Sequence, residues 1–136
     1  MGEHGLLGGP RILLVEDHPF QLIGLEMLLN HLGLFRLTPA LDCTEALETI
    51  KNGNRYDLLL CDQHLPDGRG IDLIEKAYKL GGISHAIIIS GIEDHPALQH
   101  LLWAAQQHHL PLLACLSKPL PPKLFLQVLA PLMAEK

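Results

Sequence analysis

The sequence contains few aromatic residues and no run of positive charge. Phe, Tyr and Trp make up 4% of the 136 residues, which argues against a surface that stacks nucleic-acid bases. Ten basic and fifteen acidic side chains give a formal charge of −5. Without a basic cluster the chain has little to neutralise a phosphate backbone. We therefore expect no direct contact with nucleic acid.

Cysteine is scarce, and its pattern does not indicate disulfide bonds. Cys43, Cys61 and Cys115 are odd in number and form no CxxC pair, which fits reduced thiols in a cytoplasmic protein. Cys61 and Cys115 each stand in an apolar run, so we expect both to be buried. No apolar stretch approaches the roughly 20 residues that a membrane helix needs. Residues 1–10 carry four glycines and no signal-peptide pattern. We expect a flexible head over 1–10, no membrane contact and a cytoplasmic location.

Apolar residues are abundant, at 48%, and a chain of this length normally forms one domain with one core. Strand-like apolar runs alternate with stretches of helical periodicity. The expected strands are 11–15, 35–40, 56–61, 86–89 and 112–116. The expected helices are 20–32, 42–51, 71–80, 94–109 and 121–133, with Asp42 and Glu45 forming a capping-box-like start of the second.

This fivefold βα alternation predicts a single doubly wound α/β domain with right-handed crossovers, over residues 11–134. The continuous apolar run of strand 56–61 indicates burial on both faces, as in a parallel sheet covered by helices. Pro39 cannot donate a ladder hydrogen bond, so we place strand 35–40 at the edge of the sheet. Residues 62–70 are expected to form a loop.

Polar residues directly follow four of the five expected strands. Glu16 and Asp17 follow the first, Asp62 the third, Ser90 the fourth, and Lys118 the fifth. Ligands of open α/β sheets bind at the carboxyl ends of the strands. Each residue alone has an ordinary explanation as a turn, cap or loop residue, but their joint placement predicts a site.

The chemistry of this set is coherent. Neighbouring carboxylates repel unless a cation neutralises them, and hard oxygen ligands at an open site suit Mg²⁺. Lys118 supplies a point charge for a phosphoryl group, and Ser90 can donate a hydrogen bond to a phosphoryl oxygen. A carboxylate beside Mg²⁺ and Lys can become an aspartyl phosphate. We expect Asp62 to be this nucleophile, exposed in a loop that contains Gly and Pro.

These residues carry a family resemblance. The set Glu16-Asp17, Asp62, Ser90 and Lys118-Pro119, with the sequence DQHLPDGRG at 62–70, resembles the response-regulator receiver family of two-component phosphorelay signalling. The resemblance covers about 11–132. It implies a flavodoxin-like five-stranded parallel sheet in the order 2-1-3-4-5. It also implies phosphorylation of Asp62 by a sensor histidine kinase or a phosphotransfer protein.

The resemblance further implies a role for each site residue. Asp17, Asp62 and the backbone carbonyl of His64 would bind Mg²⁺, with Glu16 assisting through water. Ser90 and Lys118 would contact the phosphoryl group. The domain would be a signalling switch with auto-phosphotransfer and slow auto-dephosphorylation, and not a metabolic enzyme.

Two features depart from the family pattern. Cys115 stands three residues before Lys118, where the family usually has an aromatic switch residue, so we expect the output to travel by another route. The segment between Ser90 and Lys118 is longer than usual and resembles receivers attached to EAL-type cyclic-di-GMP phosphodiesterase domains. The last helix is apolar on more than one side, which is compatible with a C-terminal output domain or a homodimer partner.

Two other functions stay open on the sequence alone. A degenerate receiver would bind proteins without being phosphorylated. The site of an aspartyl-nucleophile phosphatase would be similar, but this class of enzyme needs a second Asp two residues after the nucleophile. His64 stands at that position. His64 itself is either an exposed loop residue or a group that controls the access of water to an aspartyl phosphate. Trp103 is either a peripheral packing residue or a partner contact.

Overall fold

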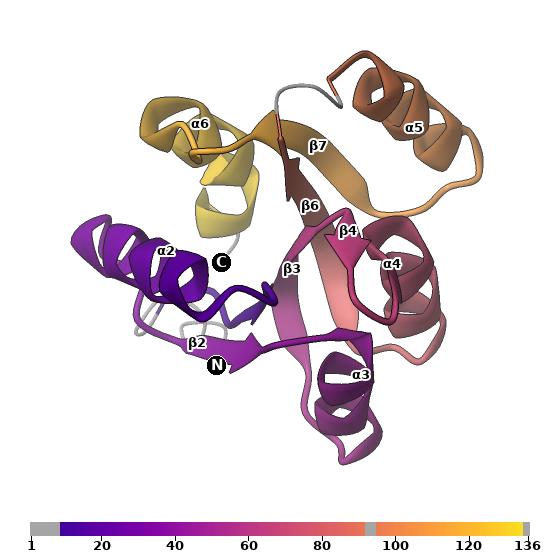
Figure 1. Cartoon of the computed structure of the whole chain (residues 1–136), viewed down its shortest axis with the longest axis horizontal. Coiled ribbons are helices and arrows are strands. Elements are labelled where there is room, and N and C mark those ends of the chain that lie inside the picture. Colours follow the sequence, from indigo (N-terminus) through magenta and orange to yellow (C-terminus); the bar gives the residue numbers. More distant parts are fainter. Residues whose placement is uncertain (1–8, 92–94, 135–136) are drawn as a thin grey trace.

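The structure, a computed structural model, describes residues 9–91 and 95–134 (Figure 1). Its main strands are β1 (Ile12–Val15), β2 (Leu37–Ala40), β3 (Tyr56–Asp62), β6 (Ile83–Ser90) and β7 (Leu112–Ser117). Its helices are α2 (Pro19–His31), α3 (Cys43–Lys51), α4 (Gly70–Lys79), α5 (His95–Gln107) and α6 (Pro122–Ala134). Two short strands, β4 (His64–Leu65) and β5 (Gly68–Arg69), lie between β3 and α4.

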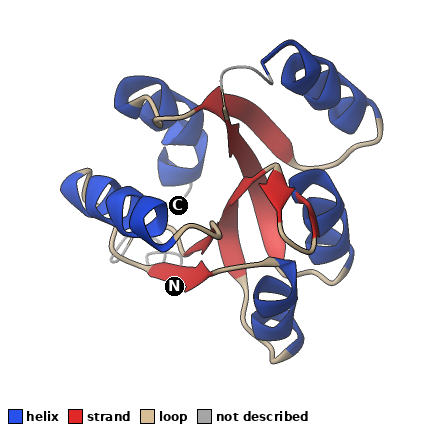
Figure 2. Ribbon diagram, viewed as in Figure 1, coloured by secondary structure: helices blue, strands red, loops and turns tan. Residues whose placement is uncertain are grey.

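The five main strands form one parallel sheet in the order β2-β1-β3-β6-β7. Counted along the main strands this is 2-1-3-4-5, so the predicted fold class and strand order are confirmed. Pro39 lies on β2 at the edge of the sheet, opposite Leu14, as its missing N–H requires. Helices cover both faces of the sheet (Figure 2).

The core has two halves, one on each face of the sheet. Alternate residues of a strand point to opposite faces, so Leu13 and Val15 pack beneath α3, α4 and α5, whereas Ile12 and Leu14 pack beneath α2 and α6. All four side chains are fully buried. Figure 1 shows the same division, with α2 and α6 on one side of the sheet and the other three helices opposite. The middle residues of β3 and β6 are apolar and buried, and the polar residues of these strands lie towards their two ends.

The prediction of a plain loop over 62–70 is wrong. β3 continues through Asp62, and β4 and β5 form a small antiparallel hairpin in which His64 pairs with Arg69. β6 also begins at Ile83, three residues before the expected start. The expected helix start at Asp94 lies outside the described residues, and so does most of the predicted head. The described chain starts at Gly9, whose carbonyl oxygen accepts a hydrogen bond from Arg36 at 3.1 Å.

Two aspartates cap the N-terminus of α3, and only one of them was predicted. The side chain of Asp42 accepts a hydrogen bond from the Glu45 amide at 2.8 Å. Asp67, from the turn of the hairpin, accepts hydrogen bonds from the amides of Cys43 and Thr44 at 2.9 and 3.0 Å and from the Thr44 hydroxyl at 2.7 Å. Slight burial acts to raise the pKa of Asp67, but the hydrogen bonds from Thr44 and Cys43 lower it to about 2. The hairpin is thereby fixed to α3.

We predict that Asp67→Ala lowers the free energy of unfolding by about 1 kcal/mol at neutral pH, the usual effect of removing a helix cap. The pKa of Asp67 in the folded protein is depressed from 3.8, so its stabilisation is present above that value and is lost as pH falls towards 2. Urea denaturation at a series of pH values measures this difference. A gap between wild type and variant that stays constant down to pH 3 would contradict the assignment. Asp72→Ala, which removes an exposed acidic side chain from the first turn of α4 and its pair with Arg69 but no cap of α3, is the control and should cost less.

Candidate functional site

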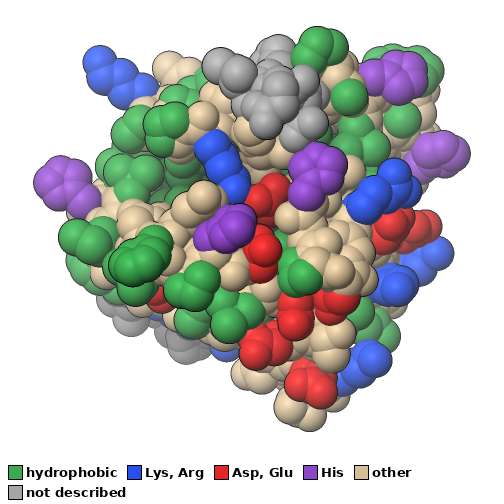
Figure 3. Space-filling model, in the orientation of Figure 1, with side chains coloured by type: hydrophobic (Ala, Val, Ile, Leu, Met, Phe, Trp, Pro, Cys, Tyr) green, Lys and Arg blue, Asp and Glu red, His purple; other side chains and the backbone are tan. Residues whose placement is uncertain are grey.

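The predicted site residues come together at the carboxyl end of the sheet. Parallel strands place their carboxyl ends at one edge, so residues far apart in the sequence meet there. Acidic side chains gather near the centre of the face shown in Figure 3, next to basic and histidine side chains. The predicted site residues are Glu16 and Asp17 after β1, Asp62 at the end of β3, His64 on β4, Ser90 at the end of β6 and Lys118 after β7.

The ammonium group of Lys118 links the two most buried carboxylates of the site. Its Nζ donates to Asp62 Oδ2 at 2.6 Å and to Glu16 Oε1 at 2.9 Å. A third hydrogen bond, 3.0 Å long, goes to Oε1 of Gln21 on α2. An ammonium group has three N–H donors, and all three are used. Gln21 was not predicted from the sequence, because a Gln in the first turn of a helix forms no motif of its own.

The same contacts determine the charge of Lys118. Its partial burial acts to lower the pKa, but hydrogen bonds from Nζ to Asp62 and Glu16, together with the negative charges of both carboxylates, raise the pKa above the ordinary value of 10.5. Lys118 therefore remains a cation at physiological pH. A positive charge at this position offsets part of the repulsion between two neighbouring carboxylates.

The backbone holds Lys118 beside Ser90. The Lys118 amide donates to the carbonyl oxygen of Ser90 at 2.9 Å, which extends the pairing of Ser90 with Ser117 between β6 and β7. Ser90 is 1% exposed. The peptide bond between Lys118 and Pro119 is cis. The two residues expected to contact a phosphoryl group are thus adjacent at the end of neighbouring strands.

Asp62 is buried, which corrects the expectation of an exposed nucleophile. The residue is 7% exposed, because β3 continues through it and it pairs with Ile89 of β6. Its Oδ1 accepts a hydrogen bond from the His64 amide at 3.1 Å, while Oδ2 is held by Lys118. Both carboxylate oxygens are therefore oriented before any ligand arrives.

Three side chains near the end of β1 could donate ligand atoms to a metal ion. Carboxylate oxygens of Glu16 and Asp17 and a ring nitrogen of His18 lie within 4.8 Å of one another. Asp62 is not a member of this compact group within the described residues, but Lys118 contacts both Glu16 and Asp62. The oxygen donors fit a hard divalent cation such as Mg²⁺, for which the imidazole of His18 is a poorer ligand. His18 was not predicted, and the carbonyl of His64 stays a predicted ligand.

Cys115 lies in the interior of β7, opposite Ile88 of β6, and is 6% exposed. Burial raises the pKa of its thiol to about 11, and burial likewise raises the pKa of the Cys61 thiol, which is fully buried. The expectation that both cysteines are buried is confirmed. A neutral, buried thiol of this kind packs as a small apolar side chain.

Residues 12–129 match the response regulator receiver domain family. The chain belongs to this family. As a receiver domain it is part of two-component signalling, and receivers generally act as switches and not as metabolic enzymes. Among the described residues, no helix is both long enough and apolar enough to cross a membrane.

Solved receiver domains have the same fold. A response regulator receiver domain from Clostridium thermocellum is 21% identical, with a TM-score of 0.73 over 90% of this chain and 92% of that one. The signal receiver domain of an HD domain-containing protein from Pseudomonas fluorescens Pf-5 is 27% identical, with a TM-score of 0.73 over 91% of this chain and 94% of that one.

A curated relative agrees with the family assignment. The two-component response regulator ARR18 of Arabidopsis thaliana is 37% identical over 68 residues, which are 49% of this chain. The match covers 11% of the length of ARR18, so this chain spans a small part of that protein.

We predict that Gly70→Ala destabilises the protein and disturbs Asp62. Gly70 begins α4 directly after the hairpin, and an added Cβ would lie 2.6 Å from the carbonyl oxygen of Asp62 and 3.2 Å from Cα of Gln63. Overpacking against a backbone of this kind costs about 1–3 kcal/mol. Chemical denaturation measures the change, and a Gly70→Ala protein as stable as wild type would contradict the prediction.

Gly24→Ala is the matched control. At Gly24, in the interior of α2, an added Cβ would meet no atom within 4 Å among the described residues. Because alanine loses less conformational entropy than glycine in a helix, this variant should be about 0.5–1 kcal/mol more stable than wild type.

Proposed function

We propose that this chain is a phosphoaccepting receiver domain that is phosphorylated on Asp62, in a reaction that depends on Mg²⁺. The donor is a sensor histidine kinase or a phosphotransfer protein in the cytoplasm. The observation that carries the proposal is the link that Lys118 Nζ makes between Asp62 and Glu16, at 2.6 and 2.9 Å. It places a cation beside the expected nucleophile, at an edge rich in oxygen ligands.

In the proposed reaction, a carboxylate oxygen of Asp62 attacks the phosphorus of a phosphohistidine. An O–P bond forms, the N–P bond breaks, and the leaving imidazole keeps the electron pair and takes a proton from water. The product is an aspartyl phosphate. Lys118 offsets the negative charge of the transferred group, and Ser90 donates a hydrogen bond to one of its oxygens.

The metal site is proposed from the same residues. Asp17 and Asp62, with the backbone carbonyl of His64, would hold Mg²⁺, and Glu16 would act through a water molecule. The bound ion would neutralise charge between the carboxylates and the phosphoryl oxygens. Glu16 has one oxygen on Lys118 and the other on the His18 amide, which favours this indirect role.

The alternative functions are less well supported. A degenerate receiver does not need Lys118, two buried carboxylates and Ser90 at one edge, yet all of them are present. A phosphatase of the aspartyl-nucleophile class needs a second carboxylate two residues after Asp62, and His64 stands there. The output of the switch stays a prediction: it is either a C-terminal domain, of the EAL type or another type, or a homodimer partner.

The decisive experiment is intact mass spectrometry after incubation with acetyl phosphate and Mg²⁺. We expect a gain of one phosphoryl group in wild type and no gain in Asp62→Asn or without metal. If wild type gains no group under conditions that phosphorylate another receiver, and also fails to bind beryllofluoride, the chain is a degenerate receiver. Continued turnover of a general phosphate ester would instead indicate a phosphatase.

We also predict that His64→Ala accelerates hydrolysis of the aspartyl phosphate severalfold. The His64 amide contacts Asp62 Oδ1 and its side chain is exposed at the site, so removing the imidazole opens a path for water. The decay of phosphorylated protein over time measures the rate. His31→Ala, at the far end of α2, is the control, and an unchanged rate in His64→Ala would exclude this role.

A further inference from the structure

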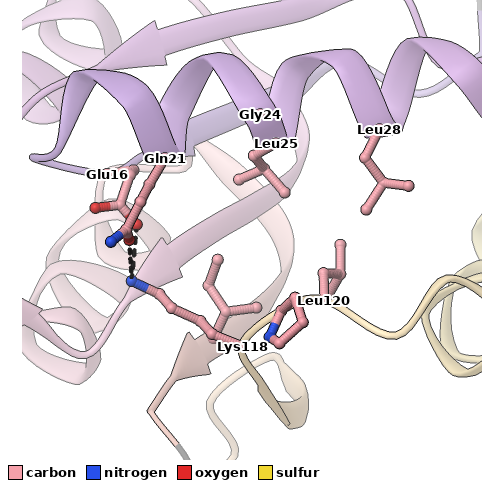
Figure 4. Close-up of a pocket in the computed structure, with 9 residues that line it drawn as sticks. Glu16, Gln21, Gly24, Leu25, Leu28, Lys118 and Leu120 are labelled. Atoms are coloured by element: carbon pink, nitrogen blue, oxygen red, sulfur yellow. Dashed lines mark hydrogen bonds and ion pairs between the residues drawn. The ribbon is translucent and has the colours of Figure 1, made fainter.

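Gln21 is the one of the three hydrogen-bond acceptors of Lys118 Nζ that no sequence motif indicates. Its amide oxygen lies 3.0 Å from Lys118 Nζ, and Figure 4 shows the side chains of Glu16 and Gln21 converging on the end of Lys118. Glu16 is 1% and Asp62 is 7% exposed, whereas Gln21 is exposed. The ammonium group thus has two buried, charged acceptors and one exposed, neutral acceptor.

We propose that Gln21 is a positioning residue: it holds Lys118 in the unphosphorylated arrangement and is the contact that Lys118 releases when Asp62 is phosphorylated. This inference rests on the proposed function. The release would transmit the state of Asp62 to α2.

The first reason is the number of donors. Lys118 has three N–H groups, and all three are occupied by Asp62, Glu16 and Gln21. If Oδ1 of Asp62 takes the phosphoryl group, Oδ2 remains an acceptor and a phosphoryl oxygen becomes a fourth. If Oδ2 takes it, Nζ must move outward to reach a phosphoryl oxygen. In both cases Lys118 cannot keep its present set of contacts and also bind the phosphoryl group.

The second reason is the unequal strength of the contacts. The contacts of Lys118 with Asp62 and Glu16 join opposite full charges, whereas the contact with Gln21 joins the ammonium to a neutral amide, which attracts it less strongly. Leaving the buried Glu16 carboxylate without its cation is costly, whereas water can replace Lys118 at the exposed amide of Gln21. The contact with Gln21 is therefore the one whose loss costs least.

The third reason is what Gln21 is attached to. Gln21 lines a groove of about 490 Å³ between α2 and the segment after β7. Leu25 and Leu28 of α2 form one wall of this groove, and Leu120 lies opposite (Figure 4). Lys118 and Gln21 form its polar end. Release of Gln21 changes this end of the groove, which provides a route to α2 that does not need an aromatic residue at Cys115.

The first test compares beryllofluoride binding, in the presence of Mg²⁺, by wild type, Gln21→Leu and Gln21→Glu. Removing the amide acceptor leaves one N–H of Lys118 available, so Gln21→Leu should bind about fivefold more tightly, the equivalent of one exposed hydrogen bond of about 1 kcal/mol. A carboxylate at this position holds Lys118 more strongly, so Gln21→Glu should bind more weakly. Shifts in opposite directions are not expected from a merely structural residue.

Two controls separate this effect from charge and from general loss of a glutamine. Ile23→Glu adds a negative charge at a half-exposed position of α2 outside the groove. Gln127→Leu removes an exposed glutamine from α6. Both should bind beryllofluoride as wild type does. If Ile23→Glu weakens binding as much as Gln21→Glu, or if the two Gln21 variants shift together or not at all, the proposal is overturned.

A second measurement does not depend on phosphorylation. The ammonium protons of Lys118, observed by NMR in the unphosphorylated protein, should exchange with water faster in Gln21→Leu than in wild type, because one N–H loses its acceptor. Unchanged exchange would show that Gln21 does not hold Lys118. If wild type binds no beryllofluoride, the proposed function fails, and the release of Gln21 fails with it. If wild type binds beryllofluoride and both Gln21 variants bind it with the affinity of wild type, this inference alone fails.

Discussion

The ion pairs of Lys118 are the interactions on which the carboxyl edge of the sheet depends. β1 and β3 end side by side, so Glu16 and Asp62 are brought together in a buried place where their charges repel. A buried charge without a partner costs several kcal/mol, and the ammonium of Lys118 offsets that cost for both carboxylates. The ammonium group of Lys118 reaches both carboxylates because β7 ends at the same edge of the sheet as β1 and β3. The backbone amide of Lys118 also donates a hydrogen bond to the carbonyl oxygen of Ser90, which fixes the residue at this edge.

The position of Asp62 also depends on the segment that follows it. The hairpin of β4 and β5 turns the chain back towards α4, and Gly70 packs so closely on the Asp62 carbonyl that a side chain would not fit. At the turn of the hairpin, Asp67 caps α3 with three hydrogen bonds. The Asp62 carboxylate is thus connected to two helices on one face of the sheet through the hairpin, and to α2 on the other face through Lys118 and Gln21.

This arrangement bears on how the domain would signal. Cys115 is a small buried side chain in β7, so the movement of an aromatic ring at that position is not available. The contact between Lys118 and Gln21 offers a connection to α2, which also presents the exposed apolar side chains of Phe20 and Met27. Phosphorylation of Asp62 would then alter the surface at α2, where a partner could detect it.

The sequence by itself determined the alternation of strands and helices, the parallel sheet, the edge position of Pro39, the cap at Asp42 and the polar residues at the strand ends. These features follow from local periodicity and from residue types, which are readable over a few neighbouring positions. Only the tertiary structure decided the burial of Asp62, the hairpin, the second cap from Asp67 and the contact of Gln21. Gln21 and Lys118 are 97 positions apart and Asp67 and Thr44 are 23 apart, so these contacts exist only after packing brings separate elements together.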